Sequence, residues 1–228
     1  MCGRFQLSVK GRHISERFNV EVFDEFYKPN YNAAPSQKLP VITNQDPGHL
    51  NYYKWGLVPF WAKDPKIGYK LINTRSETIM EKPSFKNAFN KRRCLIPANG
   101  FYEWKRGKDN EKTPYHIFLK SEDIFAMAGI WEVWKDGEGK PVHTFSIITT
   151  EPNSLMENIH NRMPVILPRE LEKAWLHEND PVNLKAMLLP FDANLMDCYP
   201  VSPRVNSPAN NDENLLTPMN EGTGNTLF

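Results

Sequence analysis

Two long strand-forming segments joined by a short turn constrain the fold more than any other feature of the chain. The first is IFAMAGIWEVW at 124–134, and the second is HTFSIITT at 143–150. Both are rich in β-branched and aromatic residues, and the DGEGK segment between them is typical of a hairpin turn. The sequence therefore predicts a β-hairpin over 124–150.

Further strand patterns flank this hairpin, and most of the helical patterns lie late in the chain. The segment YKPNYNAAPSQK is rich in Pro and Asn, which favours an ordered loop. Helices are predicted for SFKNAFNKR, NSLMENIH, PRELEKAWLHEN and PVNLKAMLL, the last with Pro181 at its first position and Asp180 as its cap. Strands are predicted for RFQLSV, LPVIT, YYKWGLV, HIFLK and, as a strand–turn–strand, CLIPANGFYEWKR. This mixture indicates an α+β fold built on an antiparallel sheet or partial barrel.

The chain carries no internal repeat and no Ser/Gly-rich linker that would divide it. Its 228 residues are enough for one large domain with a sizeable core. The last stretch is polar and rich in Gly, Asn and Thr. We therefore expect one domain over residues 2–218 and a flexible tail over 219–228.

The composition excludes several classes of protein. The net charge is +1, so any contact with nucleic acid must come from local basic clusters. The three cysteines form no CxxC pair, which argues against a disulfide framework and for a reducing compartment. The N-terminal segment lacks a signal-peptide core, and no apolar run has the length of a membrane helix. These features predict a soluble cytoplasmic protein, and we expect a monomer.

A cysteine directly follows the initiator methionine, in MCGRF. Methionine before a small residue is normally removed, and Cys2 would then carry a free amine beside its thiol. The pKa of an α-amine is about 7.7–8.0, so a fair fraction is neutral at cellular pH. A neutral amine condenses with an aldehyde to an imine, which the thiol can close to a thiazolidine. The thiol could instead attack an ester or amide with the amine as base. A buried structural cysteine is the simpler alternative.

Two further segments offer polar side chains that could act beside this terminus. Glu103 in NGFYEWKR is flanked by aromatic residues on a predicted strand, which suits a general acid–base, although pairing with Lys105 or Arg106 at the surface is the simpler interpretation. Asn73 and Arg75 in LINTRSET share one side of an extended segment. An Asn could orient an amine and an Arg could bind a phosphate, while turn formation and solvation are the simpler roles.

The last two candidate segments are ENIHNRMP and VPFWAKDP. His160 ends a predicted short helix, a place that favours a protonated imidazole, and Arg162 follows it. Phe60 and Trp61 lie beside Lys63, and aromatic and basic residues together form stacking platforms for single-stranded nucleic acid. Structural roles are the simpler alternative for each of these residues. The basic runs KRRC and KRGK are expected to be solvated surface.

Taken together, eight segments in order resemble the SRAP family, the SOS-response-associated peptidase-like or abasic-site processing proteins. The resemblance runs from residue 2 to about 218. The segments that carry it are MCGRF, YNAAPSQ, WGLVPFWAKD, INTRSET, RCLIPANGFYEWK, AMAGIWEVW, FSIITTEPN and IHNRMPVIL. The resemblance implies a single compact α+β domain with a bifurcated antiparallel sheet or small β-barrel flanked by helices.

The resemblance also implies a function: Cys2, exposed by loss of Met1, forms a covalent thiazolidine with the ring-opened sugar of an abasic site in single-stranded DNA. Asn73 would position the amine, Glu103 would move protons, and His160 would assist sugar opening and perform crosslink reversal. Neither a cofactor nor a metal is implied. The implied DNA-binding residues are Arg4, Arg75, Arg162 and Thr149, with Phe60 and Trp61 as a wedge.

Other functions stay open at this stage. Cys2 with Glu103 or His160 could act as a self-processing cysteine peptidase or N-terminal-nucleophile hydrolase, and removal of Met1 would be a limited form of it. The imine could also lead to lyase activity. A non-enzymatic reader of single-stranded or modified DNA is a further class. A zinc site from Cys2, Glu103 and His160 is a remote alternative, because these residues lack the local spacing of zinc ligands.

Overall fold

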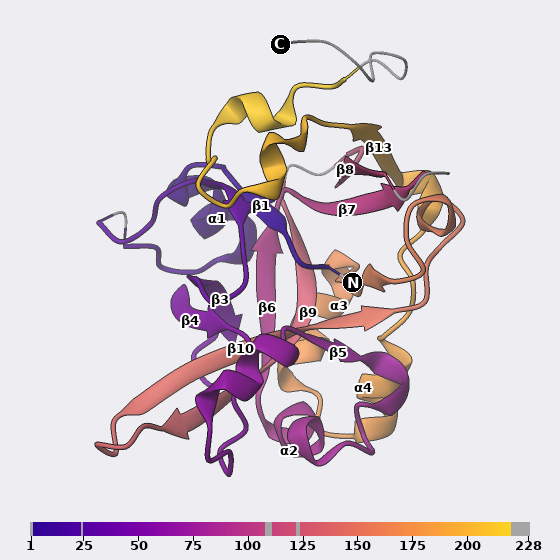
Figure 1. Ribbon diagram of the computed structural model, residues 1–228. Coiled ribbons are helices and arrows are strands. Elements are labelled where there is room, and N and C mark those ends of the chain that lie inside the picture. Colours follow the sequence, from indigo (N-terminus) through magenta and orange to yellow (C-terminus); the bar gives the residue numbers. More distant parts are fainter. Residues whose placement is uncertain (1, 24, 108–110, 122–123, 220–228) are drawn as a thin grey trace.

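The chain changes sheets at Asn99, between two strands that are almost continuous in sequence. In the computed structural model, which describes residues 2–23, 25–107, 111–121 and 124–219, β6 (Arg93–Ala98) belongs to one sheet and β7 (Gly100–Arg106) to another. The predicted strand–turn–strand over CLIPANGFYEWKR is therefore present, but its two strands do not pair with each other. Figure 1 shows β6 upright at the centre and β7 crossing above it.

The larger sheet contains a closed barrel of five strands. β10 pairs with β4 and β9, and β3 and β6 close the ring between them. The predicted hairpin forms its longest pair, with Phe145 opposite Trp131. The barrel strands are β3 (Lys38–Thr43), β4 (Asn51–Trp55), β6, β9 (Phe125–Lys135) and β10 (Pro141–Thr150). This arrangement confirms the expected small barrel within an α+β fold.

Three short strands extend the barrel beyond its ring. These are β5 (Asn73–Arg75), β11 (Met163–Pro164) and β12 (Ile166–Leu167). β5 and β4 both run parallel to β10, so the barrel sheet is mixed, whereas the second sheet is antiparallel. β5 pairs with the C-terminal half of β10, and this pairing places the INTR segment next to the IITT segment.

The second sheet is antiparallel and has the strand order β13-β8-β7-β1-β2. Its strands are β1 (Phe5–Leu7), β2 (Asn30–Ala33), β7, β8 (Lys112–Leu119) and β13 (Met196–Pro200). β2 lies inside the segment predicted to be a loop, because pairing with β1 overrides its turn-rich composition. All three residues of β1 are buried, and the polar Gln6 contacts His116 at 2.8 Å.

Four α-helices and six 3-10 helices are found among the described residues. α1 lies early in the chain and was not predicted, whereas NSLMENIH forms only a single 3-10 turn. Asp180 caps α4 as predicted, by accepting a 2.9 Å hydrogen bond from Val182. The α-helices are α1 (Gly11–Phe18), α2 (Pro83–Lys91), α3 (Arg169–His177) and α4 (Pro181–Ala186). The 3-10 helices are η1 (Pro65–Lys70), η2 (Ser76–Thr78), η3 (Met156–Asn158), η4 (Ala193–Leu195), η5 (Pro203–Asn206) and η6 (Glu213–Leu216).

Two large apolar clusters hold these elements together. One joins the two sheets and includes Phe5, Phe101, Trp55 and Phe145, with the Phe5 and Trp55 ring centroids 5.2 Å apart. The other joins the barrel to the helices and includes Trp175. Burial of such aromatic side chains is the main stabilising contribution in a domain of this size. The expected flexible tail lies outside the described residues except for Met219, whose amide donates to Pro200 at 2.8 Å.

Arg93 is the clearest departure from its predicted surface position in the KRRC run. Its side chain is 1% exposed, and its guanidinium donates to backbone carbonyls at the C-terminal ends of two helices. Phe89 and Asn90 of α2 and Trp175 of α3 are among the acceptors. Helix C-terminal carbonyls lack intrahelical partners, so one buried cation satisfies both ends. None of the helices in the described part of the chain reaches the length and apolarity that crossing a membrane requires.

Candidate active site

Cys2 lies buried between the barrel and the second sheet. In Figure 1 the segment before β1 runs between β7 and β5. The residue is fully buried, it belongs to the apolar cluster between the sheets, and its Sγ lies 3.9 Å from the carbonyl oxygen of Arg4. Burial, and next the charge of Glu103, raise the pKa of the Cys2 thiol to about 12. The sulfur is therefore a neutral thiol at cellular pH, and a base is needed to activate it.

Asn73 holds the Cys2 backbone from the neighbouring sheet. It opens β5, opposite Ile147 of β10. Its Nδ2 donates a 2.7 Å hydrogen bond to the Cys2 carbonyl oxygen. Its Oδ1 is buried and has no hydrogen-bond partner among the described residues. An acceptor in this position, beside the first residues of the chain, is suited to bind an amine N–H of Cys2.

Glu103 lies on β7, where it faces Tyr115 of β8 in the strand register. Its side chain is buried, 3% exposed, so the alternative of a surface glutamate is wrong. Its charge acts on both the Cys2 thiol and the His160 imidazole, which shows that the three groups are within electrostatic reach of one another. A buried carboxylate near a thiol and an imidazole is the arrangement required for proton transfer.

His160 follows η3, a single 3-10 turn that ends at Asn158. Burial lowers the pKa of His160, while the nearby Glu103 charge opposes this shift. This direction is opposite to the one expected at a helix C-terminus, because desolvation outweighs the contribution of so short a helix. Its Nδ1 accepts from the backbone N–H of Arg162 at 3.1 Å and lies 3.3 Å from the Arg162 carbonyl oxygen, so the backbone of Arg162 fixes the ring.

Arg162 is fixed by a carboxylate that sequence reasoning missed. Its Nη1 and Nη2 bind the two oxygens of Glu77 at 2.5 and 2.9 Å, and Nη2 also donates to the carbonyl of Thr149 at 2.6 Å. The hydrogen bond from Arg162 lowers the pKa of Glu77, whose side chain is 49% exposed. Glu77 stands two positions after Arg75 in the INTRSET motif, and this proximity was the available signal.

The remaining predicted DNA-binding residues occupy different environments. Thr149 is fully buried, and its Oγ1 donates to the carbonyl of Thr74 at 3.4 Å. Arg75 is exposed on β5, opposite Thr149. Arg4 is half-buried, with Nη1 donating to Asn32 Oδ1 at 2.8 Å and to the Val205 carbonyl at 2.6 Å. The structure thus places Arg75 at the surface and uses Arg4 and Thr149 in internal contacts.

Phe60 and Trp61 project from a closed loop between β4 and β5. Their side chains are 57% and 48% exposed, although both are large apolar groups. The base of the loop is tight, because a Cβ on Gly56 would lie 2.7 Å from the Gly68 carbonyl oxygen. Gly56 has φ +123°, a conformation that glycine adopts readily. Trp134 of β9, a residue that sequence reasoning missed, donates from Nε1 to the Ala62 carbonyl at 2.7 Å.

The arrangement favours chemistry at the N-terminal residue itself. Cys2, Asn73, Glu103 and His160 come from four separate segments and meet beside the start of the chain. No group of three or more His, Cys, Asp and Glu side chains able to hold a metal occurs in the part of the chain that the structure describes. The structure is therefore an α+β protein that gathers a cysteine, an asparagine, a glutamate and a histidine beside the start of its chain.

Comparisons with known proteins agree with this class. The family model "SOS response associated peptidase (SRAP)" matches residues 1–208. The abasic site processing protein YoqW of Bacillus subtilis is 51% identical over 221 residues, which cover 95% of this chain and 99% of YoqW. The abasic site processing protein HMCES of Rattus norvegicus is 34% identical, over 84% of this chain and 65% of its own. The chain belongs to the SRAP family.

A solved structure confirms the fold. A crystal structure of a protein from Bacteroides thetaiotaomicron superposes with a TM-score of 0.88 at 33% identity. The match covers 96% of this chain and 100% of the other. The barrel, the second sheet and the flanking helices are therefore the architecture expected for a member of this family.

Proposed function

We propose that the protein senses abasic sites in single-stranded DNA and captures them covalently through Cys2 once Met1 has been removed. The observation that carries this proposal is the contact of Asn73 with Cys2, made by Nδ2 while Oδ1 stays buried without a partner among the described residues. This side chain would hold the residue at its carbonyl and its amine together. The printed names of the relatives, abasic site processing proteins, support the choice of substrate.

The first chemical step is attack of the Cys2 nitrogen on the aldehyde carbon C1′ of the ring-opened sugar. The resulting carbinolamine loses water and becomes an imine, and Glu103 takes up and returns the protons that this step moves. His160 donates a hydrogen bond to the sugar oxygen as the ring opens. An abasic site has no base to unstack, so its sugar reaches a protein site at low cost.

The second step is addition of the Cys2 sulfur to the imine carbon. The S–C bond forms, the C=N double bond becomes a single bond, and the thiol proton reaches the nitrogen through Glu103. The product is a thiazolidine, and one water molecule is released overall. The high pKa of the thiol suits this order, because a free thiolate is not needed until the imine has formed.

The other activities in this proposal use the same site. The imine can lead to strand cleavage as in a DNA lyase, and reversal of the crosslink would use Glu103 and His160. Removal of Met1 is assigned to autocatalytic hydrolysis, a limited peptidase activity. Arg4, Arg75, Arg162 and Thr149 would bind the DNA backbone or line the site, with Phe60 and Trp61 as the wedge. We place the monomeric protein in the cytoplasm, associated with the nucleoid when bound to DNA.

A denaturing gel tests the proposal. The protein is incubated with a single-stranded oligonucleotide that contains one abasic site, and a shifted band is expected for the wild type. Cys2→Ala and a chain extended before Cys2 should give none, while the matched variant Cys94→Ala should still crosslink. A reader of DNA would shift only on native gels, and a peptidase would cleave peptides without a shift. Intact mass shows whether the chain starts at Cys2.

A further inference from the structure

A polar hollow of about 640 Å³ opens beside the proposed catalytic residues. Its volume lies within the range of small-ligand sites. Lys105 on β7 lines it, two residues beyond Glu103 and on the same face of the strand, about 7 Å along. Ile159, which directly precedes His160, lines it as well. The hollow is therefore lined by residues from two of the segments that carry the site, β7 and the stretch that ends at His160.

The side chains that line the hollow are complementary to the groups of a nucleotide. Lys105 is its charged member, and the ammonium lies 5.7 Å from the ring centroid of Tyr115. Leu155 and Tyr199 contribute apolar and aromatic wall. Asn158 on η3 and Asn194 on η4 are exposed and also line the hollow, and Nδ2 of Asn158 donates to the Ser154 carbonyl at 3.2 Å. An ammonium suits a phosphate, aromatic faces suit a base, and amides suit its polar edge.

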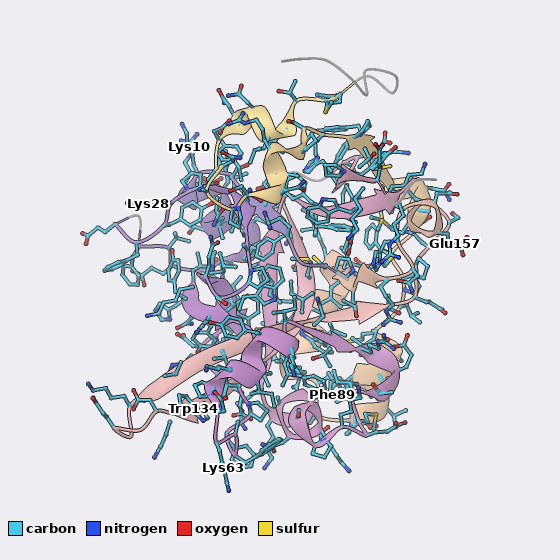
Figure 2. All side chains as sticks on the ribbon, viewed as in Figure 1. Lys10, Lys28, Lys63, Phe89, Trp134 and Glu157 are labelled. Carbon is cyan, nitrogen blue, oxygen red and sulfur yellow. The ribbon has the colours of Figure 1, made fainter. Side chains whose placement is uncertain are left out.

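The position of the hollow relative to the wedge gives a direction for the DNA strand. Figure 2 shows Lys63, the second residue after Trp61, at the lower edge of the molecule and Glu157 of η3 at the right edge. In Figure 1 the N-terminal end of the chain lies between β7 and β5, inward from the edges of the molecule. A single strand that contacts the wedge on one side of an abasic sugar at Cys2 would reach the hollow on the other.

We propose that this hollow is a binding site for the nucleotide next to the abasic sugar, with its base held among Tyr199, Asn158 and Asn194 and its phosphate by Lys105. The inference rests on the proposed function, because an abasic site at Cys2 places a neighbouring nucleotide here. The site selects for an intact base on one side of the lesion only. It therefore makes capture sensitive to the sequence and integrity of the flanking strand.

The test pairs protein variants with three oligonucleotides. Each contains one reactive abasic site, flanked by normal nucleotides, by a baseless tetrahydrofuran residue on the 5′ side, or by one on the 3′ side. Wild-type protein should crosslink about tenfold more slowly with one of the two baseless oligonucleotides, a loss of the size expected for one or two hydrogen bonds or one stacking contact. Asn158→Ala combined with Asn194→Ala should show a similar loss with the normal oligonucleotide and no further loss with that same baseless one.

Lys105→Ala has a separate readout. It should weaken binding to all three oligonucleotides and reduce the slope of log K against log salt by about one, the contribution of one phosphate contact. Lys10→Ala and Asn183→Ala are matched controls at exposed positions elsewhere, on the segment before α1 and on α4, and should leave rates and slope unchanged.

Several outcomes would overturn the inference. One is a crosslinking rate of the double Asn variant that equals the wild-type rate with the normal oligonucleotide. Another is a loss in this variant that multiplies the loss caused by the baseless residue, whether that residue lies on the 5′ or the 3′ side. If wild-type protein does not crosslink at all, the proposed function fails instead. The same variant–substrate cycle is then measured as equilibrium affinity, by fluorescence anisotropy with a stable tetrahydrofuran in place of the reactive site. If the effects of the Asn variant and of the baseless residue on affinity are coupled on one side of the lesion, the nucleotide site is supported. If they are independent on both sides, it is rejected.

Discussion

Asn73 donates from Nδ2 to the carbonyl oxygen of Cys2 at 2.7 Å, across 71 positions of sequence. The contact joins the N-terminal residue to β5, which is itself held parallel to β10 in the barrel extension. Cys2 is thus held by the barrel extension even though β1 belongs to the second sheet. The proposed function requires such a fixed position, because a reacting group gains rate when its geometry is set before the reaction.

Removing this contact should slow capture without unfolding the protein. We expect Asn73→Ala to lower the single-turnover crosslinking rate by about 10- to 100-fold, since it loses a hydrogen bond to the backbone and the acceptor for the amine. The measurement is a denaturing-gel time course with abasic single-stranded DNA. Asn183→Ala is the control, and an unchanged rate for Asn73→Ala would contradict the assigned role.

Neutralising Glu103 should lower the pKa of the Cys2 thiol and yet slow the crosslinking reaction. The charge of Glu103, after burial, raises the pKa of Cys2, so Glu103→Gln should lower that pKa from about 12. The crosslinking rate should nevertheless fall by about 100-fold or more, because the proton carrier is lost. Difference titration of thiolate absorbance against Cys2→Ala measures the first effect. A faster reaction in Glu103→Gln would reject the acid–base role.

Glu77 pairs with the guanidinium of Arg162, and a DNA phosphate that binds Arg162 would have to compete with this carboxylate. Glu77→Gln removes a negative charge and one partner of a bidentate pair, so we expect tighter binding of undamaged single-stranded DNA and a steeper salt dependence. The gain should be about threefold to tenfold in affinity at low salt, measured by fluorescence anisotropy. Glu81→Gln, an exposed neighbour, is the matched control. Weaker binding by Glu77→Gln would show that the carboxylate orients Arg162 for DNA.

The buried guanidinium of Arg93 should be essential for stability. Arg93→Met removes hydrogen bonds to the carbonyls of Phe89, Asn90 and Trp175 and leaves them unsatisfied in the interior. We expect the free energy of unfolding to fall by about 3 kcal/mol or more. Lys91→Met, at an exposed neighbouring position, should change it by about 0.5 kcal/mol or less. Urea denaturation compares the two, and equal stabilities would contradict the role of Arg93.

His116 should make stability depend on pH in the acid range. Burial lowers its pKa from 6.5 to about 4, and its ring contacts Gln6 at 2.8 Å. Between these pH values the unfolded chain binds a proton at His116 that the folded chain does not. The contribution of His116 to stability therefore falls as pH decreases from 6.5 to 4, and this contribution is constant above pH 6.5. The loss should approach about 3 kcal/mol.

The variant His116→Gln isolates this contribution. Urea denaturation at a series of pH values should show a flatter dependence between pH 6.5 and 4 than the wild type shows. The baseline stability of the variant is not the readout, because Gln also alters packing against Gly100, which lies close to the ring. Identical slopes for the two proteins would mean that His116 does not titrate on unfolding in this range.

The sequence predicted the elements that depend on local pattern. The hairpin of β9 and β10, the α2 helix, and the Asp180 cap of α4 all follow from residues close together in the chain. β2 and α1 were missed, because turn-rich composition in one and mixed charge in the other hide elements that tertiary contacts stabilise. The change from one sheet to the other at Asn99 was also not predicted, because a strand–turn–strand pattern does not show whether its two strands pair with each other.

The candidate site divides in the same way. The available side chains, Cys2 directly after Met1 and the Asn, Glu and His of three motifs, could be found from the sequence, because they are chemical identities. Tertiary contacts are needed to learn that Glu103 is buried, that burial lowers the pKa of His160, and that Glu77 pairs with Arg162 across 85 positions. Burial and charge pairing arise from residues far apart in sequence, and a local pattern carries no information about either.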